Sequence, residues 1–240
     1  AAARMFAAQG ARLALVDING EAAQAAAARL VADGARAVGI GADITSAERC
    51  KSMVAEVEAA LGPLTVVVNS AAVLDDKTFL ESTPTDWKRI VDVCLYGAMN
   101  VLHAALPGMV ERKYGRVVLL ASDSARLGQA RLSYYAAAKA GVIALVKSVA
   151  QEVGGAGVTL NIVSPGATNT ELRQERERGM REAMGEEKYA RRVKSVLKMY
   201  PAGRIGEPDD IAGAIFYLCS ASAGWVTGQV LSVNGGYAMP

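Results

Sequence analysis

Two residues of the segment SYYAAAKAG, at positions 133–141, have the types and spacing for proton transfer. Tyr135 and Lys139 lie four positions apart in an alanine-rich stretch that reads as a helix, and residues four apart share one helix face. Tyr134 has Ala138 at the same offset, so the spacing selects Tyr135. A tyrosine of ordinary pKa, about 10, is a poor base near pH 7, but a neighbouring ammonium favours the phenolate. The pair predicts a phenol that exchanges a proton with a substrate oxygen.

Other interpretations of single residues stay open at this stage. A tyrosine and a lysine four apart on a helix usually form a solvated surface pair. His103, the only histidine, stands among apolar residues and is expected to be a packed core residue rather than a catalyst.

Composition limits the class of protein. The 240 residues are 52% hydrophobic and contain no linker rich in proline, serine or glycine, which predicts a single domain over residues 1–240. A net charge of +2 is too balanced for a nucleic-acid-binding protein. The longest apolar stretch, at 93–110, is interrupted by polar residues and a proline, so we expect a buried helix and no membrane span.

The three cysteines, Cys50, Cys94 and Cys219, are far apart and have no ligand spacing. An odd number of this kind disfavours a disulfide framework or a metal site and fits a reducing compartment. We expect a cytoplasmic protein without a bound metal.

Apolar runs alternate with helical patterns along the chain. The runs lack polar alternation, as in parallel strands covered on both faces, and lie at 13–16, 37–40, 64–68, 117–120, 158–163 and 230–233. Helical patterns lie between them, at about 20–33, 46–61, 84–112, 132–153 and 208–220. Thr45 with Glu48 forms a possible capping box, and Thr83 before Pro84 a possible helix start. The alternation predicts an α/β fold with a doubly wound parallel sheet.

Ligands bind such sheets beyond the carboxyl ends of the strands. Polar or turn-forming residues follow five of the predicted strands, namely Asp17, Asp43, Asn69, Ser70, Ser122, Pro165, Gly166 and Thr170. These positions are the candidate site.

With these positions in view, the chain resembles the short-chain dehydrogenase/reductase family along nearly its whole length. The matching motifs are YAAAK at 135–139, SPGATNT at 164–170, NSAAV at 69–73, GRIGEPDDIA at 203–212 and TGQVLSVNGG at 227–236. One Tyr-x-x-x-Lys alone is a short pattern; the ordered set is specific. The resemblance implies a Rossmann-like, three-layer α/β/α domain with a substrate lid at about 170–200, and an oxidoreductase interconverting a secondary alcohol and a ketone.

The resemblance also implies roles for individual residues. Tyr135 is the acid/base, Lys139 tunes it and holds the nicotinamide ribose, and a serine binds the substrate oxygen. Ser122, 13 residues before Tyr135, matches the family's interval better than Ser124. Besides Tyr135 and Lys139, the implied cofactor-binding residues are Asp17, Asp43, Ile44, Asn69, Ala71, Pro165, Gly166, Thr168 and Thr170.

Asp17 bears on the choice of cofactor. A carboxylate at this strand end suits the ribose hydroxyls of NAD(H) and repels the 2′-phosphate of NADP(H), so we expect NAD(H). Asp17 is also placed to begin a turn before Asn19 and Gly20, and Asp43 is placed to help cap the helix after Thr45.

The chain departs from the family in two places. Within VCLYG at 93–97, Cys94 stands where the family has an asparagine that orders a water, and a thiol is a weak donor and acceptor. Ala72 stands where the family has a glycine. The sequence opens on what resembles the helix after the family's glycine-rich turn, without that turn or the strand before it. The implied strand lies between those ending at Asp17 and Asn69, so we expect about 15–20 further residues, a strand and a turn, before this sequence.

The segment at 170–200 carries nine basic residues and six glutamates. Mixed charge on a helix is usually a solvated face, and a basic surplus also suits an acidic carrier such as the phosphates of coenzyme A.

The segment at 106–128 is similar to dehydrogenases of alicyclic alcohols or hydroxyacyl thioesters. The resemblance implies a homotetramer or homodimer. A catalytically impaired nucleotide-binding or scaffolding protein of the same fold is the alternative.

Overall fold

The protein is described here by a computed structural model that covers residues 1–239, apart from the side chain of residue 172. Six strands form two parallel sheets. In the first, β1 (Arg12–Asp17) pairs with β2 (Arg36–Gly41). In the second, β3 (Val66–Asn69), β4 (Gly115–Leu120), β5 (Val158–Pro165) and β6 (Val230–Val233) lie in that order. Each crossover between parallel strands contains helices, as the alternating pattern predicts.

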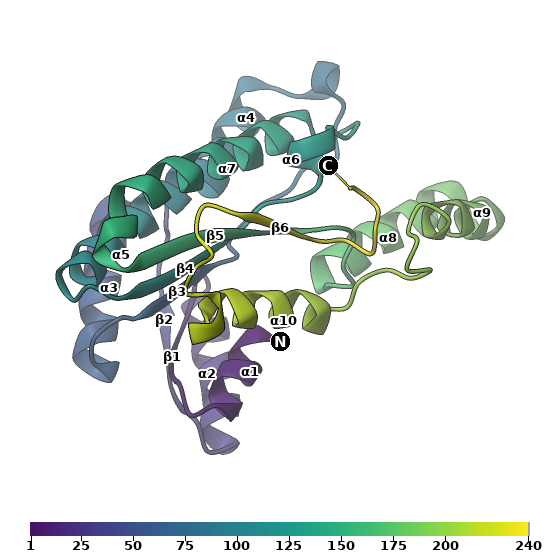
Figure 1. The fold of residues 1–240 in the computed structure, drawn as a ribbon. Helices are drawn as coiled ribbons and strands as arrows, with labels where there is room; N and C mark the ends of the chain where they lie inside the picture. The colour runs from purple at the N-terminus through teal and green to yellow at the C-terminus, as the bar shows by residue number, and fades with distance from the viewer. Residues whose placement is uncertain (240) are drawn as a thin grey trace.

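Helices cover both faces of the four-stranded sheet, as Figure 1 shows. One layer contains α5 (Gly97–Glu111) and α7 (Ser133–Val153), with α3 (Ala47–Leu61) against α5. The other contains α10 (Pro208–Cys219) with α1 (Ala2–Ala8) packed on it. α2 (Gly20–Ala32) packs on β1 and β2. The architecture is a Rossmann-like three-layer α/β/α sheet.

The remaining helices border the carboxyl ends of the strands. α4 (Pro84–Val91) leads through a π-helical turn, Asp92–Tyr96, into α5, and the short α6 (Ser124–Leu127) precedes α7. After β5, α8 (Glu171–Met184) and α9 (Glu186–Leu197) project away from the sheet (Figure 1).

The core explains why β4 and β5 are rich in Val, Ile and Leu, although β5 also buries Thr159 and Asn161. Both strands are buried along almost their entire length. On one face Leu119, Leu160 and Ile162 join the buried residues of α5 and α7, and on the other Val118 and Val163 pack against α10. Strands with helices on both faces have no solvated side to alternate toward.

The strand and helix predictions are confirmed to within a few residues, with corrections at the ends. Ser46, not Thr45, caps α3, because its hydroxyl accepts the backbone N–H of Arg49. Thr83 caps α4 as expected, with Pro84 in the first turn. The predicted helix at 84–112 is divided by the π-helical turn. His103, expected in the core, is exposed on α5.

β1 and β3 are the inner edges of the two sheets and do not pair with each other in the described residues. Their burial reflects this, since β3 is only half-buried and β1 has an exposed carboxyl end, whereas β4 is nearly fully buried. Residues 1–239 provide no strand between them, at the position where the resemblance implies one.

One helical stretch, Pro84–Glu111, is long and apolar enough to cross a membrane by length and composition. Core helices pass the same test, and this one packs into the domain. Ile90, Ala98, Leu102 and Met109 are almost fully buried in its core clusters. The stretch is a core helix, as predicted.

Candidate active site

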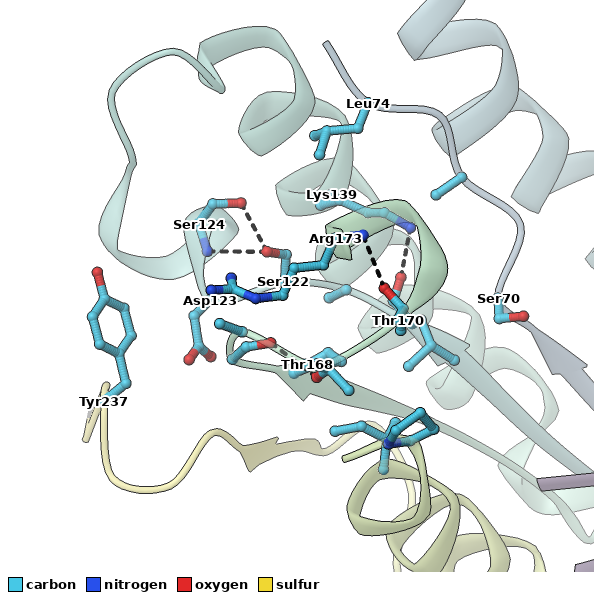
Figure 2. A pocket seen from close by; sticks show the side chains of 18 of the residues that line it. Ser70, Leu74, Ser122, Asp123, Ser124, Lys139, Thr168, Thr170, Arg173 and Tyr237 are labelled. Carbon is cyan, nitrogen blue, oxygen red and sulfur yellow. Dashed lines mark hydrogen bonds between the residues drawn. The ribbon is translucent and has the colours of Figure 1, made fainter. Parts of the chain in front are cut away.

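A cavity of about 610 Å³ opens at the carboxyl ends of β4 and β5. It brings together seven of the residues to which the resemblance assigns a role, from three separate segments: Ser122, Tyr135, Lys139, Pro165, Gly166, Thr168 and Thr170. Figure 2 shows Ser122 and Lys139 on one side of this space and Thr168 and Thr170 on another. The topology explains the convergence, because parallel strands end at the same edge of the sheet.

Ser122 and Ser124 both line the cavity but have different surroundings. The Ser122 oxygen accepts the backbone N–H of Ser124 at 3.3 Å and its hydroxyl at 2.9 Å. A hydroxyl whose oxygen is already an acceptor has its own proton left to donate. Ser124 is buried, and its hydroxyl proton is used in the hydrogen bond to Ser122. The geometry therefore favours Ser122 as the group that faces a ligand.

The two adjacent tyrosines are separated by the helix geometry, as the spacing predicts. Tyr135 lines the cavity. Tyr134 is buried in a side cluster with Ile90 and Cys94 and does not line it, and its hydroxyl donates to Asp75 at 3.2 Å. Burial beside Asp75 raises the pKa of Tyr134 to about 12, so it stays protonated.

The electrostatics of Tyr135 differ from the expectation. We expected the Lys139 ammonium to lower the phenol pKa. Instead burial, with a smaller contribution from Cys94, raises the pKa of Tyr135 to about 12, while the contact with Ser122 acts to lower it. The Lys139 nitrogen lies 5.9 Å from the centroid of the Tyr135 ring and donates to the carbonyl of Leu120 at 2.8 Å. The cation is therefore engaged by the backbone.

Lys139 is a buried cation with unused hydrogen-bonding capacity. Its side chain is only 3% exposed, and burial lowers its pKa. An ammonium has three N–H donors, and only the Leu120 carbonyl accepts from it among the described residues. Two donors are left for hydroxyl groups of a bound molecule. The residues present thus fit the ribose end of a nicotinamide cofactor.

The other predicted cofactor-binding residues, which include those expected at the adenosine end, lie outside the cavity. Asp17, Asp43, Ile44, Asn69 and Ala71 are at the ends of β1, β2 and β3 and do not line it. Asp17 begins a turn, which is the alternative predicted for it, whereas Asp43 bonds Thr45 and the cap of the following helix is Ser46. Asp17 accepts the N–H of Asn19, Asp43 that of Thr45, and Asn69 that of Ala71. Asp17 is exposed, so its carboxylate is accessible to a ligand.

Cys94 lies in the π-helical turn beside the tyrosine helix. It is 2% exposed, and its sulfur lies 3.6 Å from the carbonyl oxygen of Val73. π-Helical turns shift the hydrogen-bonding register of a helix and occur often at functional sites. The resemblance implies a water-ordering asparagine at this position, and a thiol is a weaker hydrogen-bond partner than an amide.

Asp123 was missed in the sequence, although it stands between the two candidate serines. It is buried in the cavity wall and accepts hydrogen bonds from Ser164 at 3.0 Å and from Asn234 at 2.8 Å. Burial raises its pKa, and these hydrogen bonds and Arg126 oppose the shift. Asn234 also donates to the carbonyl of Ala238. Asp123 therefore ties the C-terminal segment to the serine loop.

The C-terminal segment and the residues just after α9 form an aromatic wall. The Tyr237 ring stacks on that of Tyr200 with 5.1 Å between centroids, and both line the cavity. The Tyr200 hydroxyl accepts the N–H of Ala167, next to Gly166. A Cβ on Gly166 would lie 2.9 Å from the Cβ of Asn234, so glycine permits this close approach of the two loops.

Comparison with known proteins gives a consistent family. A family model described as enoyl-(acyl carrier protein) reductase matches residues 1–238. Acetoacetyl-CoA reductase of Shinella zoogloeoides is 37% identical, covering 81% of this chain and 76% of the relative. The inactive 2-(S)-hydroxypropyl-CoM dehydrogenase 2 of Xanthobacter autotrophicus is 36% identical over 95% of both chains. A 3-oxoacyl-(acyl-carrier-protein) reductase of Vibrio cholerae is 33% identical over 84% of this chain and 78% of the relative.

Proposed function

The chain belongs to the short-chain dehydrogenase/reductase family, a family of nicotinamide-dependent oxidoreductases, and from that premise we propose that it interconverts a secondary alcohol and a ketone. The proposed substrates are hydroxyacyl thioesters and alicyclic alcohols. The relatives' names support this class, because acetoacetyl-CoA and 3-oxoacyl thioesters carry a ketone one methylene away from the thioester carbonyl.

The chemistry divides between a cofactor and the chain. A nicotinamide cofactor supplies or accepts the hydride when it is bound. Ser122 donates a hydrogen bond to the substrate oxygen and orients it. Tyr135 gives the proton to that oxygen in reduction and takes it away in oxidation, and Lys139 holds the ribose hydroxyls and favours the phenolate once its ammonium turns from Leu120.

One observation supports the proposal above the others. Ser122, from the loop after β4, and Tyr135 and Lys139, from α7, line one cavity, while the adjacent Tyr134 is turned away and bonded to Asp75. A surface pair would not bring a buried ammonium and a partly buried phenol to the same cavity as a serine.

An absorbance assay at the NADH band tests the proposal. The panel is acetoacetyl-CoA, 3-hydroxybutyryl-CoA and cyclic secondary alcohols, each with NAD(H) and with NADP(H). Turnover that disappears in Tyr135→Phe supports it. No turnover of any member, or turnover that survives in Tyr135→Phe, contradicts it.

A catalytically impaired, nucleotide-binding protein is the second candidate. It is supported by Cys94 at the asparagine position and by the orientation of Lys139 toward Leu120. In that case the wild-type protein binds NADH, detected by fluorescence, but turns over no substrate, and Cys94→Asn gains activity. If wild type is active, and Cys94→Asn changes kcat by less than about twofold, this candidate fails.

The finer assignments follow from the same premise. We assign NAD(H) rather than NADP(H) because the exposed Asp17 carboxylate would repel a 2′-phosphate.

Residues 1–240 are one domain with a lid at about 170–200. The protein is a cytoplasmic homo-oligomer, a tetramer or dimer, that acts on small molecules and not on nucleic acid or membranes. Its three cysteines, all buried and unpaired, suit a reducing compartment.

A further inference from the structure

The geometry points to an anion-binding subsite in the same cavity, formed by Arg173 of α8 and Arg192 of α9, which binds a carboxylate, sulfonate or phosphate group of the ketone substrate. The inference deepens the proposed function and rests on it, because it assigns the far end of the molecule whose oxygen lies at Ser122. We call Arg173 and Arg192 the lid arginine pair.

The lid arginine pair carries an excess of positive charge. Both arginines share one carboxylate, that of Glu177, at 2.9 Å from Arg173 and 3.0 Å from Arg192. Neither forms an ion pair with a second carboxylate among the described residues. Two guanidiniums and one carboxylate leave one positive charge in excess. Arg176, the third lid arginine lining the cavity, is paired with Asp76 at 2.7 Å and adds no such excess, because Asp76 and Glu81 together balance Arg176 and Arg131.

The lid arginine pair lies in the wall of the active-site cavity. Both arginines line the cavity that contains Ser122 and Tyr135, and Figure 2 shows Arg173 extending from α8 into this space. Their side chains are 25% and 31% exposed, and that of Glu177 is 13% exposed. Partial burial weakens solvent screening, so an excess charge here attracts an anion more strongly than one on the surface.

The outer face of the lid provides the contrast. Its ion pairs, Arg181 with Glu186 and Arg191 with Glu187, have one arginine for each carboxylate, and all four side chains are more than half exposed. These are the solvated pairs that a mixed-charge helix normally carries. Among the lid ion pairs of the described residues, only the inner, half-buried one has two arginines on a single carboxylate.

The chemistry of the ligand follows from the lining. A guanidinium matches carboxylate, sulfonate and phosphate oxygens with two parallel N–H donors. Leu74, Leu132, Val196 and Met199 also line the cavity and provide apolar surface for a linker between the ketone and the anion. Phosphates of the cofactor share this chemistry, so the experiment must separate the two sources.

Matched ketones test the subsite. The probes are 4-oxopentanoate, 5-oxohexanoate and 6-oxoheptanoate, each against its methyl ester, which keeps the ketone and removes the charge. Reduction by NADH is measured at constant ionic strength for wild type, Arg173→Gln, Arg173→Lys and the control Arg178→Gln. Arg178 is on the same helix, is exposed and does not line the cavity. Calorimetric titration of each acid and ester, without NADH, measures binding independently of turnover.

We expect wild type to prefer at least one acid to its ester by about 10- to 100-fold in kcat/KM, the range for a hydrogen bond to a charged group. Arg173→Gln should abolish the preference by raising KM for the acid toward that for the ester, Arg173→Lys should keep part of the preference, and Arg178→Gln should keep all of it. Equal use of acid and ester by wild type overturns the subsite but leaves the proposed function standing.

Two further outcomes separate the remaining possibilities. A preference that persists in Arg173→Gln, with a raised KM for NADH, assigns the pair to cofactor phosphates and overturns the inference. If none of these ketones is reduced, the titrations decide the subsite, since tighter binding of acid than ester that is lost in Arg173→Gln supports it and equal binding contradicts it. The proposed function is decided separately, by the panel of thioesters and cyclic alcohols.

Discussion

The ammonium of Lys139 donates to the carbonyl of Leu120 and lies 5.9 Å from the ring centroid of Tyr135. The lysine is thus held beside the phenol without a direct hydrogen bond to it. Because the two groups are on one face of α7, a rotation of the lysine side chain is enough to move the cation closer.

Removal of the Tyr135 hydroxyl tests the acid/base assignment. Tyr135→Phe should lower kcat by about 100- to 10,000-fold, the usual contribution of general acid–base catalysis, with little change in stability. Tyr134→Phe is the matched control, because it loses only the hydrogen bond to Asp75. It should keep turnover and lose about 1 kcal/mol of unfolding free energy. Equal losses of kcat in the two variants would contradict the assignment.

The pH profile should differ between the two directions of the reaction. Burial raises the pKa of Tyr135 to about 12, so the phenol is protonated in the neutral range. Ketone reduction uses the protonated form and should stay level from about pH 6 to about pH 9. Alcohol oxidation uses the phenolate, whose fraction rises tenfold per pH unit below the pKa, so its rate should rise steadily with pH.

Difference absorbance of wild type minus Tyr135→Phe measures the phenol directly in the protein without ligands. We expect no phenolate below about pH 10. A phenolate signal near pH 7 would show that Lys139 already lowers the pKa in the free protein.

Replacement of Lys139 should affect cofactor binding. Lys139→Met removes the buried donors and leaves the Leu120 carbonyl without this partner, which costs about 1–3 kcal/mol of stability. The KM for NADH should rise about tenfold or more, for the loss of charged hydrogen bonds. Lys147→Met, an exposed position on the same helix, should leave both quantities unchanged. An unaltered KM in Lys139→Met would exclude the ribose role.

Asp123 should stabilise the serine loop. In Asp123→Asn one side-chain oxygen still accepts from Ser164, but an amide then faces the amide of Asn234. Asn234 has no free rotation to compensate, because it also bonds Ala238 and Gly236. We expect a loss of about 1–3 kcal/mol in unfolding free energy and a lower kcat through Ser122, measured by denaturant titration and by the NADH assay.

The raised pKa of Asp123 sets the sign of its pH dependence. The native state binds this proton more readily than the unfolded chain, so the contribution to stability is greatest below the unfolded pKa and falls as pH rises to the native value. Asp123→Asn should flatten that part of the stability profile. A steeper profile in the variant would contradict the direction of the shift.

Cofactor preference should depend on Asp17. Asp17→Ser removes the carboxylate that repels a 2′-phosphate. Wild type should use NADH better than NADPH by kcat/KM, and the variant should reduce this ratio by about tenfold or more. Asp33→Ser, outside the expected cofactor residues, is the control. A wild-type preference for NADPH would overturn the assignment.

The sequence by itself determined the elements and their order. Runs rich in Val, Ile and Leu, such as 117–120 and 158–163, became the buried strands β4 and β5, and the offset of four residues placed Tyr135, rather than Tyr134, on the face of α7 that meets the cavity. These features follow from backbone periodicity and from burial on two faces, which are local properties of a chain.

Only the tertiary structure decided which groups form ion pairs and hydrogen bonds with one another. Arg173 and Arg192 meet at Glu177 because α8 folds back on α9, and Asp123 meets Asn234 because β6 lies beside β5. The same packing turned Lys139 to Leu120, and burial raised the Tyr135 pKa that spacing alone suggested would fall. Burial and partner geometry depend on segments far apart in the chain, so residue spacing carries no direct signal of them.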